Sequence, residues 1–245
     1  MSYIYRPGNL GSTPKKDPVT IPLSKILNFT GKAQKVGPDM YQFTLFTPEF
    51  CRYLLDIADK SNEWVPDGEV DKKGKTVGFE PGWGSHPPQG RQAPSLFNFM
   101  DNYRARYFGT DTDDGEHPNA MALASLPGME EIYTTVVRKH VSPLIKKLWP
   151  YFTRQVWDQP VILRYDATAP KKERGMEMHL DDENLAMVVY LNNEYKGGGT
   201  YFPVQNITAK PPAGSAVMFP GGLTHPHSGL PVTSGSRYIL LGGFY

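Results

Sequence analysis

Two histidines and one aspartate in the C-terminal third of the chain have the types and spacing of a metal site. His179 and Asp181 are two residues apart, so in an extended segment both side chains point to the same side. His227 is the candidate for the third ligand, although His225 is a rival that spacing alone does not exclude. Two imidazoles and one carboxylate bind non-haem Fe(II) on one face and leave the opposite face open for chemistry.

An arginine follows these residues within an apolar segment. Arg237 precedes Tyr238, Ile239, Leu240 and Leu241, and a guanidinium buried in such a strand needs a carboxylate partner. Its planar fork suits a carboxylate bound through both oxygens. We therefore predict that Arg237 binds an acidic cosubstrate, which we interpret as 2-oxoglutarate.

These four residues are informative only together. A His-x-Asp triplet alone is often a pair of polar surface residues. A distant histidine in a glycine-rich turn, followed by an arginine that opens the last strand, makes the iron-site interpretation more specific than the triplet does.

Composition narrows the class of protein. The 245 residues can bury a full core, and the net charge of +1 disfavours a nucleic-acid groove or a basic membrane-binding face. No apolar run approaches the roughly 20 residues that span a bilayer, so we expect no transmembrane segment. The one cysteine, Cys51, excludes an intrachain disulfide and is expected to be a small buried residue.

The C-terminal part of the chain has the pattern of a β-sheet protein. Strands are predicted where β-branched and aromatic residues alternate, at 161–165, 185–191, 200–204, 215–219 and 237–244. Glycine- and proline-rich turns separate these strands, as in a jelly roll. The predicted fold is α+β, with a double-stranded β-helix (jelly-roll, cupin-like) core at about 161–245, flanking helices and long loops.

Helices and loops are predicted in the first two thirds. A helix should begin at Thr47-Pro48-Glu49, which combine a capping hydroxyl, an N-terminal proline and an acidic first turn. A second helical segment is predicted over 127–149, with an interruption near Pro143. Residues 1–40 are expected to form an N-terminal arm, and 41–245 to form the catalytic domain.

The sequence around these residues resembles the catalytic domain of the procollagen lysyl hydroxylases. The likeness is weak from Tyr41 and strong from Val161, and it leaves out the first 40 residues. The matching segments are Leu163-Arg164-Tyr165, His179-Leu180-Asp181, Tyr190-Leu191-Asn192-Asn193, Gly197-Gly198-Gly199, the run from Phe219 to Val232, and Arg237-Tyr238. The run from Phe219 to Val232 is far more specific than the three ligands alone.

The resemblance implies an enzyme that uses Fe(II), 2-oxoglutarate, O2 and L-ascorbate. The implied iron ligands are His179, Asp181 and His227, with His227 favoured over His225 because it directly precedes the segment Ser228-Gly229-Leu230-Pro231. Arg237 is the implied catalytic residue that binds 2-oxoglutarate, and Tyr165 is implied to lie near the same cosubstrate. The implied reaction is hydroxylation of the lysine δ-carbon in Gly-X-Lys sequences of collagen or collagen-like peptides.

Residues for the substrate are less defined. Asp182 and Glu183 stand where the animal enzymes have small or hydroxyl residues, and they are candidates to hold the lysine ammonium or are solvated turn residues. Trp83 is a candidate for lining the substrate cleft. The alternatives to a lysyl hydroxylase are a prolyl hydroxylase of the same superfamily and a non-catalytic collagen-binding module.

Assembly and compartment follow only from family precedent. A homodimer is expected, with Leu223, an apolar residue in a glycine-rich turn, as a candidate contact. The absence of a visible signal peptide and the single cysteine resemble a virus-encoded member more than an animal one. The compartment would be the host cell for a viral protein, or the endoplasmic reticulum lumen by precedent of the family.

Overall fold

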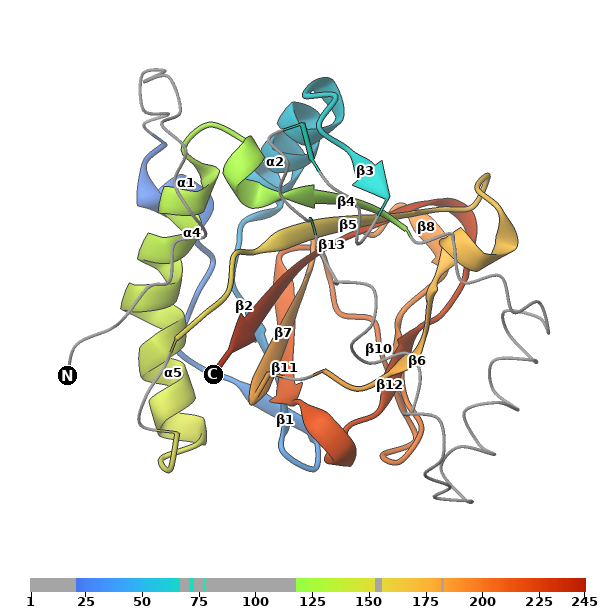
Figure 1. Ribbon diagram of the computed structural model, residues 1–245. Coiled ribbons are helices and arrows are strands. Elements are labelled where there is room, and N and C mark those ends of the chain that lie inside the picture. The colour runs from blue at the N-terminus through green and yellow to red at the C-terminus, as the bar shows by residue number, and fades with distance from the viewer. Residues whose placement is uncertain (1–20, 67–70, 73–76, 78–117, 153–155, 182) are drawn as a thin grey trace.

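Strands from the last third of the chain form two antiparallel sheets that lie face to face (Figure 1). The computed structural model describes residues 21–66, 71–72, 77, 118–152, 156–181 and 183–245. The larger sheet contains the central strands β11 (Ser215–Pro220), β7 (Leu185–Tyr190), β13 (Val232–Phe244) and β5 (Val161–Asp166), in that order. The smaller sheet has the order β10 (Ile207–Ala209), β9 (Thr200–Phe202), β12 (His227–Gly229) and β6 (Met176–His179).

The chain changes sheet after almost every strand. It passes from β5 in the larger sheet to β6 in the smaller, then to β7, to β9 and β10, to β11, to β12 and back to β13. Every strand pair in both sheets is antiparallel. This alternation is the double-stranded β-helix that was predicted, and it confirms the jelly-roll core.

Further strands extend the larger sheet at both edges. One edge carries β2 (Met40–Thr44) and β1 (Gln34–Gly37), and the other carries β4 (Asn119–Ala122) and β3 (Val65–Pro66). β8 (Tyr195–Gly197) pairs with the first part of β13. The hairpin of β1 and β2 spans residue 40, so it includes the end of the segment predicted as an arm.

Helices cover the outer face of the larger sheet, which is opposite the smaller sheet (Figure 1). They are α1 (Leu23–Ile26), α2 (Pro48–Lys60), η1 (Leu123–Ser125), α4 (Met129–Val136) and α5 (Ser142–Leu148). A π-helical turn, Val137–Val141, joins α4 to α5. The interruption predicted near Pro143 within the helix at 127–149 corresponds to this π-helical turn, which ends two residues before the proline.

Helix α2 begins as its sequence predicts. The Thr47 hydroxyl accepts a hydrogen bond from the Phe50 backbone N–H at 3.1 Å, and Pro48 is the first helical residue. The buried side of the helix consists of Phe50, Cys51, Leu54 and Ala58. Cys51 is only 1% exposed, and burial raises the pKa of its thiol to about 12, so it is a packing residue as predicted.

Short helical and turn segments complete the barrel. η3 (Lys171–Arg174) lies between β5 and β6, and η4 (Gly222–Thr224) lies between β11 and β12.

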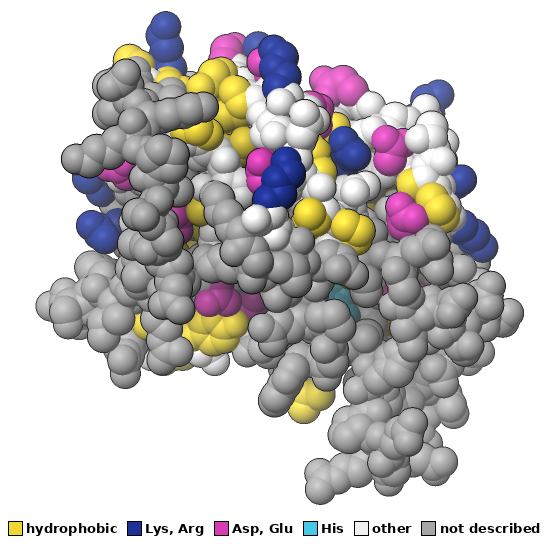
Figure 2. Space-filling model, turned by 45° about the horizontal axis from the view of Figure 1, so that its top comes forward, with side chains coloured by type: hydrophobic (Ala, Val, Ile, Leu, Met, Phe, Trp, Pro, Cys, Tyr) yellow, Lys and Arg dark blue, Asp and Glu magenta, His cyan; other side chains and the backbone are white. Residues whose placement is uncertain are grey.

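On the face shown in Figure 2, acidic and basic side chains are interspersed over the described surface. No helix within the described ranges has both the length and the apolar character needed to cross a bilayer.

Candidate active site

The three candidate metal ligands meet at one end of the barrel. His179 is the last residue of β6, and it lies opposite His227, the first residue of β12. The His179 Nε2 is 3.5 Å from Asp181 Oδ1, and the His227 Nε2 is 3.6 Å from Asp181 Oδ2. All three potential ligand atoms lie within 4.8 Å of one another. The pairing of β6 with β12 in the smaller sheet thus brings together residues that are far apart in sequence.

Backbone carbonyls fix the orientation of both imidazole rings. The His179 Nδ1–H donates to the Glu177 carbonyl at 2.7 Å, and the His227 Nδ1–H donates to the His225 carbonyl at 3.1 Å. A carbonyl can only accept, so each ring carries its proton on Nδ1 and keeps the Nε2 lone pair for the centre of the cluster. Metal-binding histidines are typically oriented in this way.

The surroundings of His227 favour its neutral form. Its ring is stacked with Phe202 at 5.3 Å between ring centroids and meets Phe219 edge to face at 4.9 Å. Burial is the main cause that lowers the pKa of His227 to about 4, against a smaller opposing effect of Asp181. A neutral imidazole at neutral pH is the form that binds metals.

The loop that carries Asp181 is held against the turn before η4. The Gly222 N–H donates to the Asp181 carbonyl at 2.7 Å, and the Gly221 N–H donates to the Asn184 carbonyl at 3.1 Å. A Cβ atom at position 221 would clash with the Glu183 carbonyl oxygen. Glycine is therefore required here for close approach, which fixes the aspartate relative to the two histidines.

His225 is not in a position to bind the same metal. Its Nε2–H donates to the Pro38 carbonyl at 2.9 Å, and its Nδ1 is 2.9 Å from the Thr224 hydroxyl. Both ring nitrogens are therefore already hydrogen-bonded. The structure thus separates the two histidines that spacing left open.

Arg237 lies inside the barrel, deeper than the three ligands. It is 1% exposed, and its guanidinium lies over the rings of Tyr165 and Tyr190, at 5.2 and 5.1 Å. A Cβ atom built on Gly229 would lie 3.4 Å from Arg237 Nη1. Gly229 follows His227 by two residues on the same strand, so the guanidinium sits about 7 Å along the strand from that histidine.

The guanidinium of Arg237 has donors to spare. Its Nη2 donates to the Thr200 hydroxyl at 3.0 Å, whereas Nε and Nη1 are buried without a hydrogen-bond partner. No carboxylate within the described part of the chain forms an ion pair with it. A buried, permanently charged group with unused donors is suited to an acidic ligand.

Hydrogen-bonded hydroxyl groups link the Arg237 guanidinium to the backbone of β10. The Tyr190 hydroxyl is 2.6 Å from the Thr200 hydroxyl and donates to the Ala209 carbonyl at 2.9 Å. Since the tyrosine has only one proton, Thr200 donates to Tyr190 and accepts from Arg237. The sequence offered Thr200 and Tyr190 only as strand residues, and a polar side chain facing inward was the signal that could have identified them.

Of the remaining residues predicted to contact the cosubstrate or the substrate, Tyr165 and Glu183 lie within the described structure. Tyr165 lies beneath the Arg237 guanidinium, as its proposed role near the cosubstrate requires. A Cβ atom on Gly243 would meet the Glu183 carboxylate, so Glu183 points toward β13 on the strand face that Arg237 shares. Trp83 and Asp182 lie outside the described residues. Binding of substrate by Glu183, Asp182 and Trp83 therefore stays a prediction.

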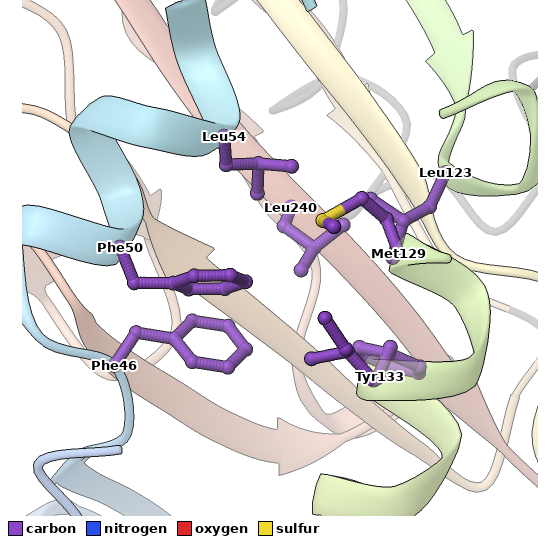
Figure 3. Close-up of a pocket in the computed structure, with 8 residues that line it drawn as sticks. Phe46, Phe50, Leu54, Leu123, Met129, Tyr133 and Leu240 are labelled. Atoms are coloured by element: carbon purple, nitrogen blue, oxygen red, sulfur yellow. The ribbon is translucent and has the colours of Figure 1, made fainter. Parts of the chain in front are cut away.

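An apolar pocket lies on the opposite face of the larger sheet (Figure 3). Phe50 and Leu54 of α2 face Met129 and Tyr133 of α4 across it, with Leu240 of β13 at its base. Arg237 and the three ligands do not line it. The pocket belongs to the packing between helices and sheet, and it is separate from the candidate site.

Comparison with known proteins agrees with this geometry. Residues 162–245 match the family model described as the 2OG-Fe(II) oxygenase superfamily. The chain contains a 2OG-Fe(II) oxygenase domain. The matched segment includes all three candidate ligands and Arg237, and the predicted class of 2OG-dependent dioxygenase is confirmed.

Relatives of the oxygenase domain are named as collagen-modifying enzymes. The chain is 28% identical to human procollagen-lysine,2-oxoglutarate 5-dioxygenase 1 over 208 residues, which are 82% of this chain and 23% of that protein. It is 26% identical to the procollagen lysyl hydroxylase and glycosyltransferase of Acanthamoeba polyphaga mimivirus over 224 residues, 89% of this chain and 21% of that protein. The chain thus spans less than a quarter of the length of these relatives.

A solved structure was also matched. The viral collagen prolyl hydroxylase from Paramecium Bursaria Chlorella virus-1, in its 2OG complex, aligns with 49% of this chain and 74% of that chain. The TM-score is 0.40 and the sequence identity is 23%.

Proposed function

We propose that the oxygenase domain hydroxylates the δ-carbon of lysine in Gly-X-Lys sequences of collagen-like peptides. His179, Asp181 and His227 would hold Fe(II), and Arg237 would bind the carboxylate of 2-oxoglutarate farthest from the metal. The observation that carries this proposal is the buried guanidinium of Arg237, which has unused donors and no carboxylate partner in the described structure. It lies deeper in the barrel than the ligands, beside Gly229 of β12.

The residues fit the groups that the family uses. Two imidazoles and a carboxylate match the preference of Fe(II), and the unused Nε and Nη1 of Arg237 match a carboxylate. When bound, Fe(II) and 2-oxoglutarate supply oxygen activation. Overall, one atom of O2 becomes the lysine hydroxyl and the other enters succinate as CO2 is released. L-Ascorbate would keep the iron in its ferrous state.

The protein's own contribution would be placement and exclusion of water. Carbonyls direct the Nε2 atoms of both histidines to one point, and two tyrosine rings lie against the Arg237 guanidinium. The low exposure of Arg237 and His227 keeps the region dry, which strengthens the attraction between a guanidinium and a carboxylate. No separate general base is needed for this reaction class.

The choice of lysine is supported by the names of the relatives. The two relatives described above match over most of this chain and are named a procollagen-lysine 5-dioxygenase and a procollagen lysyl hydroxylase. The family resemblance also implies that a prolyl hydroxylase would usually have a lysine in place of Arg237. A prolyl hydroxylase is the second candidate, and a collagen-binding module without activity is the third. The buried Arg237 argues against the third, because a binding module has no need for an unpartnered internal charge.

Mass spectrometry of paired peptides tests the proposal. The chain is incubated with Fe(II), ascorbate and 2-oxoglutarate together with a Gly-X-Lys peptide or a matched Gly-X-Pro peptide. A gain of one oxygen atom on lysine is expected, with one succinate formed for each hydroxylation. Oxidation of proline alone would support the prolyl alternative, and no oxidation with intact peptide binding would support the binding module.

Dimerisation through Leu223 stays a separate prediction. Leu223 is 77% exposed in η4, close in sequence to His225 and His227. If it mediates a homodimer, Leu223→Asp should halve the solution mass measured by light scattering. An unchanged mass relative to a dimeric parent would remove Leu223 from the interface.

A further inference from the structure

The backbone carbonyls that orient the two candidate histidine ligands lie in different kinds of structure. The carbonyl that holds His179 belongs to Glu177, which lies inside strand β6 between Met176 and His179, two residues that pair with β12. The carbonyl that holds His227 belongs to His225, which lies between η4 and β12 in an irregular conformation, with φ −130° and ψ 56°. No strand pairing fixes that carbonyl, so another interaction has to hold it.

The ring of His225 provides that interaction. It is 3% exposed, and its two nitrogens contact the Pro38 carbonyl and the Thr224 hydroxyl, both at 2.9 Å. Pro38 belongs to the turn of the β1–β2 hairpin, whose strand β2 pairs with β11. The ring therefore ties His225, the second residue before β12, to a hairpin 187 positions away in the sequence.

The segment before His227 is held from a second side as well. The Gln205 side-chain amide donates to the Thr224 carbonyl at 2.8 Å, which joins this segment to the turn between β9 and β10. On the other side, a Cβ atom on Gly37 would lie 2.6 Å from Ile207 of β10, so the hairpin turn also touches the smaller sheet. The β1–β2 turn thus bridges the edge strands of both sheets next to His225.

We propose that His225 is a positioning residue for the metal centre, an inference that rests on the proposed function. Its ring anchors its backbone on Pro38, and its carbonyl then sets the orientation of His227 through the Nδ1–H. The β1–β2 hairpin is accordingly a part of the metal centre, although it contributes no ligand. Residues that orient metal-binding histidines typically change metal affinity about 10- to 100-fold when they are altered.

Metal affinity of the full chain tests this role without relying on turnover. Binding of Mn(II) alone is measured by the loss of the free-ion electron paramagnetic resonance signal. We expect His225→Ala to weaken Mn(II) binding about 10- to 100-fold. His225→Gln should restore most of the affinity, because its amide N–H can still donate to the Pro38 carbonyl.

Matched controls separate positioning from general packing. His140→Gln alters a histidine of the π-helical turn whose ring contacts Phe29, and it should leave Mn(II) affinity unchanged. The melting temperature of each metal-free variant is measured in parallel. If His225→Ala lowers this temperature while Mn(II) affinity stays within about twofold of the parent, the positioning role is refuted and His225 is only a packing residue.

A second variant covers the case in which His225→Ala does not fold. Thr224→Val removes the hydroxyl beside Nδ1 and should weaken Mn(II) binding in the same direction but less; equal affinity to the parent would refute the role. His179→Ala serves as the reference. If His179→Ala binds Mn(II) as tightly as the parent, the metal site itself is wrong, which is a different failure from that of His225.

Discussion

The two faces of the larger sheet show how one strand serves structure and chemistry at once. On β13, Tyr238 and Leu240 face the helices, whereas Arg237 and Ile239 face the barrel. The outer cluster consists of apolar and aromatic side chains with one small pocket, and it holds α2 and α4 in place. The inner face carries a buried charge and lies on the same side as the candidate metal ligands.

This difference teaches that burial has opposite consequences on the two faces. On the outer face, burial stabilises the fold because the groups are apolar. On the inner face, burial of Arg237 costs free energy that a bound carboxylate would recover. Substitutions should therefore divide into those that change stability and those that change ligand binding.

The largest effect is expected at Asp181. Asp181→Asn keeps the shape of the side chain but removes the charge between the two histidines, so metal binding and turnover should fall to background. The check is the succinate formed from 2-oxoglutarate with added Fe(II). Asp56→Asn, which alters an exposed carboxylate on α2, is the control and should retain activity.

The next effect is expected at Arg237. Arg237→Gln removes the charge that would bind the distal carboxylate, and the dissociation constant for 2-oxoglutarate should rise roughly 100-fold or more. The dissociation constant of Arg237→Lys should lie between those of the parent and Arg237→Gln. A lysine keeps the positive charge but lacks the planar pair of donors of a guanidinium. Titration calorimetry with 2-oxoglutarate provides the measurement, and an unchanged constant would contradict the cosubstrate role.

The opposite face should respond through stability alone. Leu240→Ala should lower the free energy of unfolding by about 3 kcal/mol, because Leu240 is buried beside the outer pocket. The affinity for 2-oxoglutarate should not change. Urea denaturation and calorimetry on the same sample test both parts, and a large loss of affinity would show that the two faces are coupled.

The metal-free chain should lose stability as the solution is acidified. Burial lowers the pKa of His227 from 6.5 to about 4, so between these values the unfolded chain binds more protons than the folded one. The contribution is fully present above about pH 6.5 and is lost toward pH 4, up to about 3 kcal/mol. Urea titrations with chelator at several pH values should show this slope, and His227→Gln should flatten it.

The smallest effect is expected at Thr200. Thr200→Val removes the hydroxyl that accepts from Arg237, and the dissociation constant for 2-oxoglutarate should rise roughly fivefold, about 1 kcal/mol. Thr200→Ser keeps a hydroxyl and should restore most of the affinity. If both variants bind like the parent, the hydroxyl chain behind Arg237 does not contribute to cosubstrate binding.

Local chemistry in the sequence determined the candidate residues and the class of fold. The two-residue spacing of His179 and Asp181 and the buried arginine in an apolar strand suggested iron and an acidic cosubstrate. The alternation of apolar residues and turns predicted the jelly roll, and the capping residues at Thr47 predicted the start of α2. These signals depend on neighbours in sequence, so they could be identified without the structure.

Only the tertiary structure decided between residues with the same local pattern. His225 and His227 are equivalent by spacing. They differ because the ring of His225 is hydrogen-bonded to the Pro38 carbonyl, which belongs to a distant hairpin. Thr200, Tyr190 and Gly229 acquire their places around Arg237 when the two sheets close on each other. Such contacts join strands that are remote in the chain, and no local pattern specifies them.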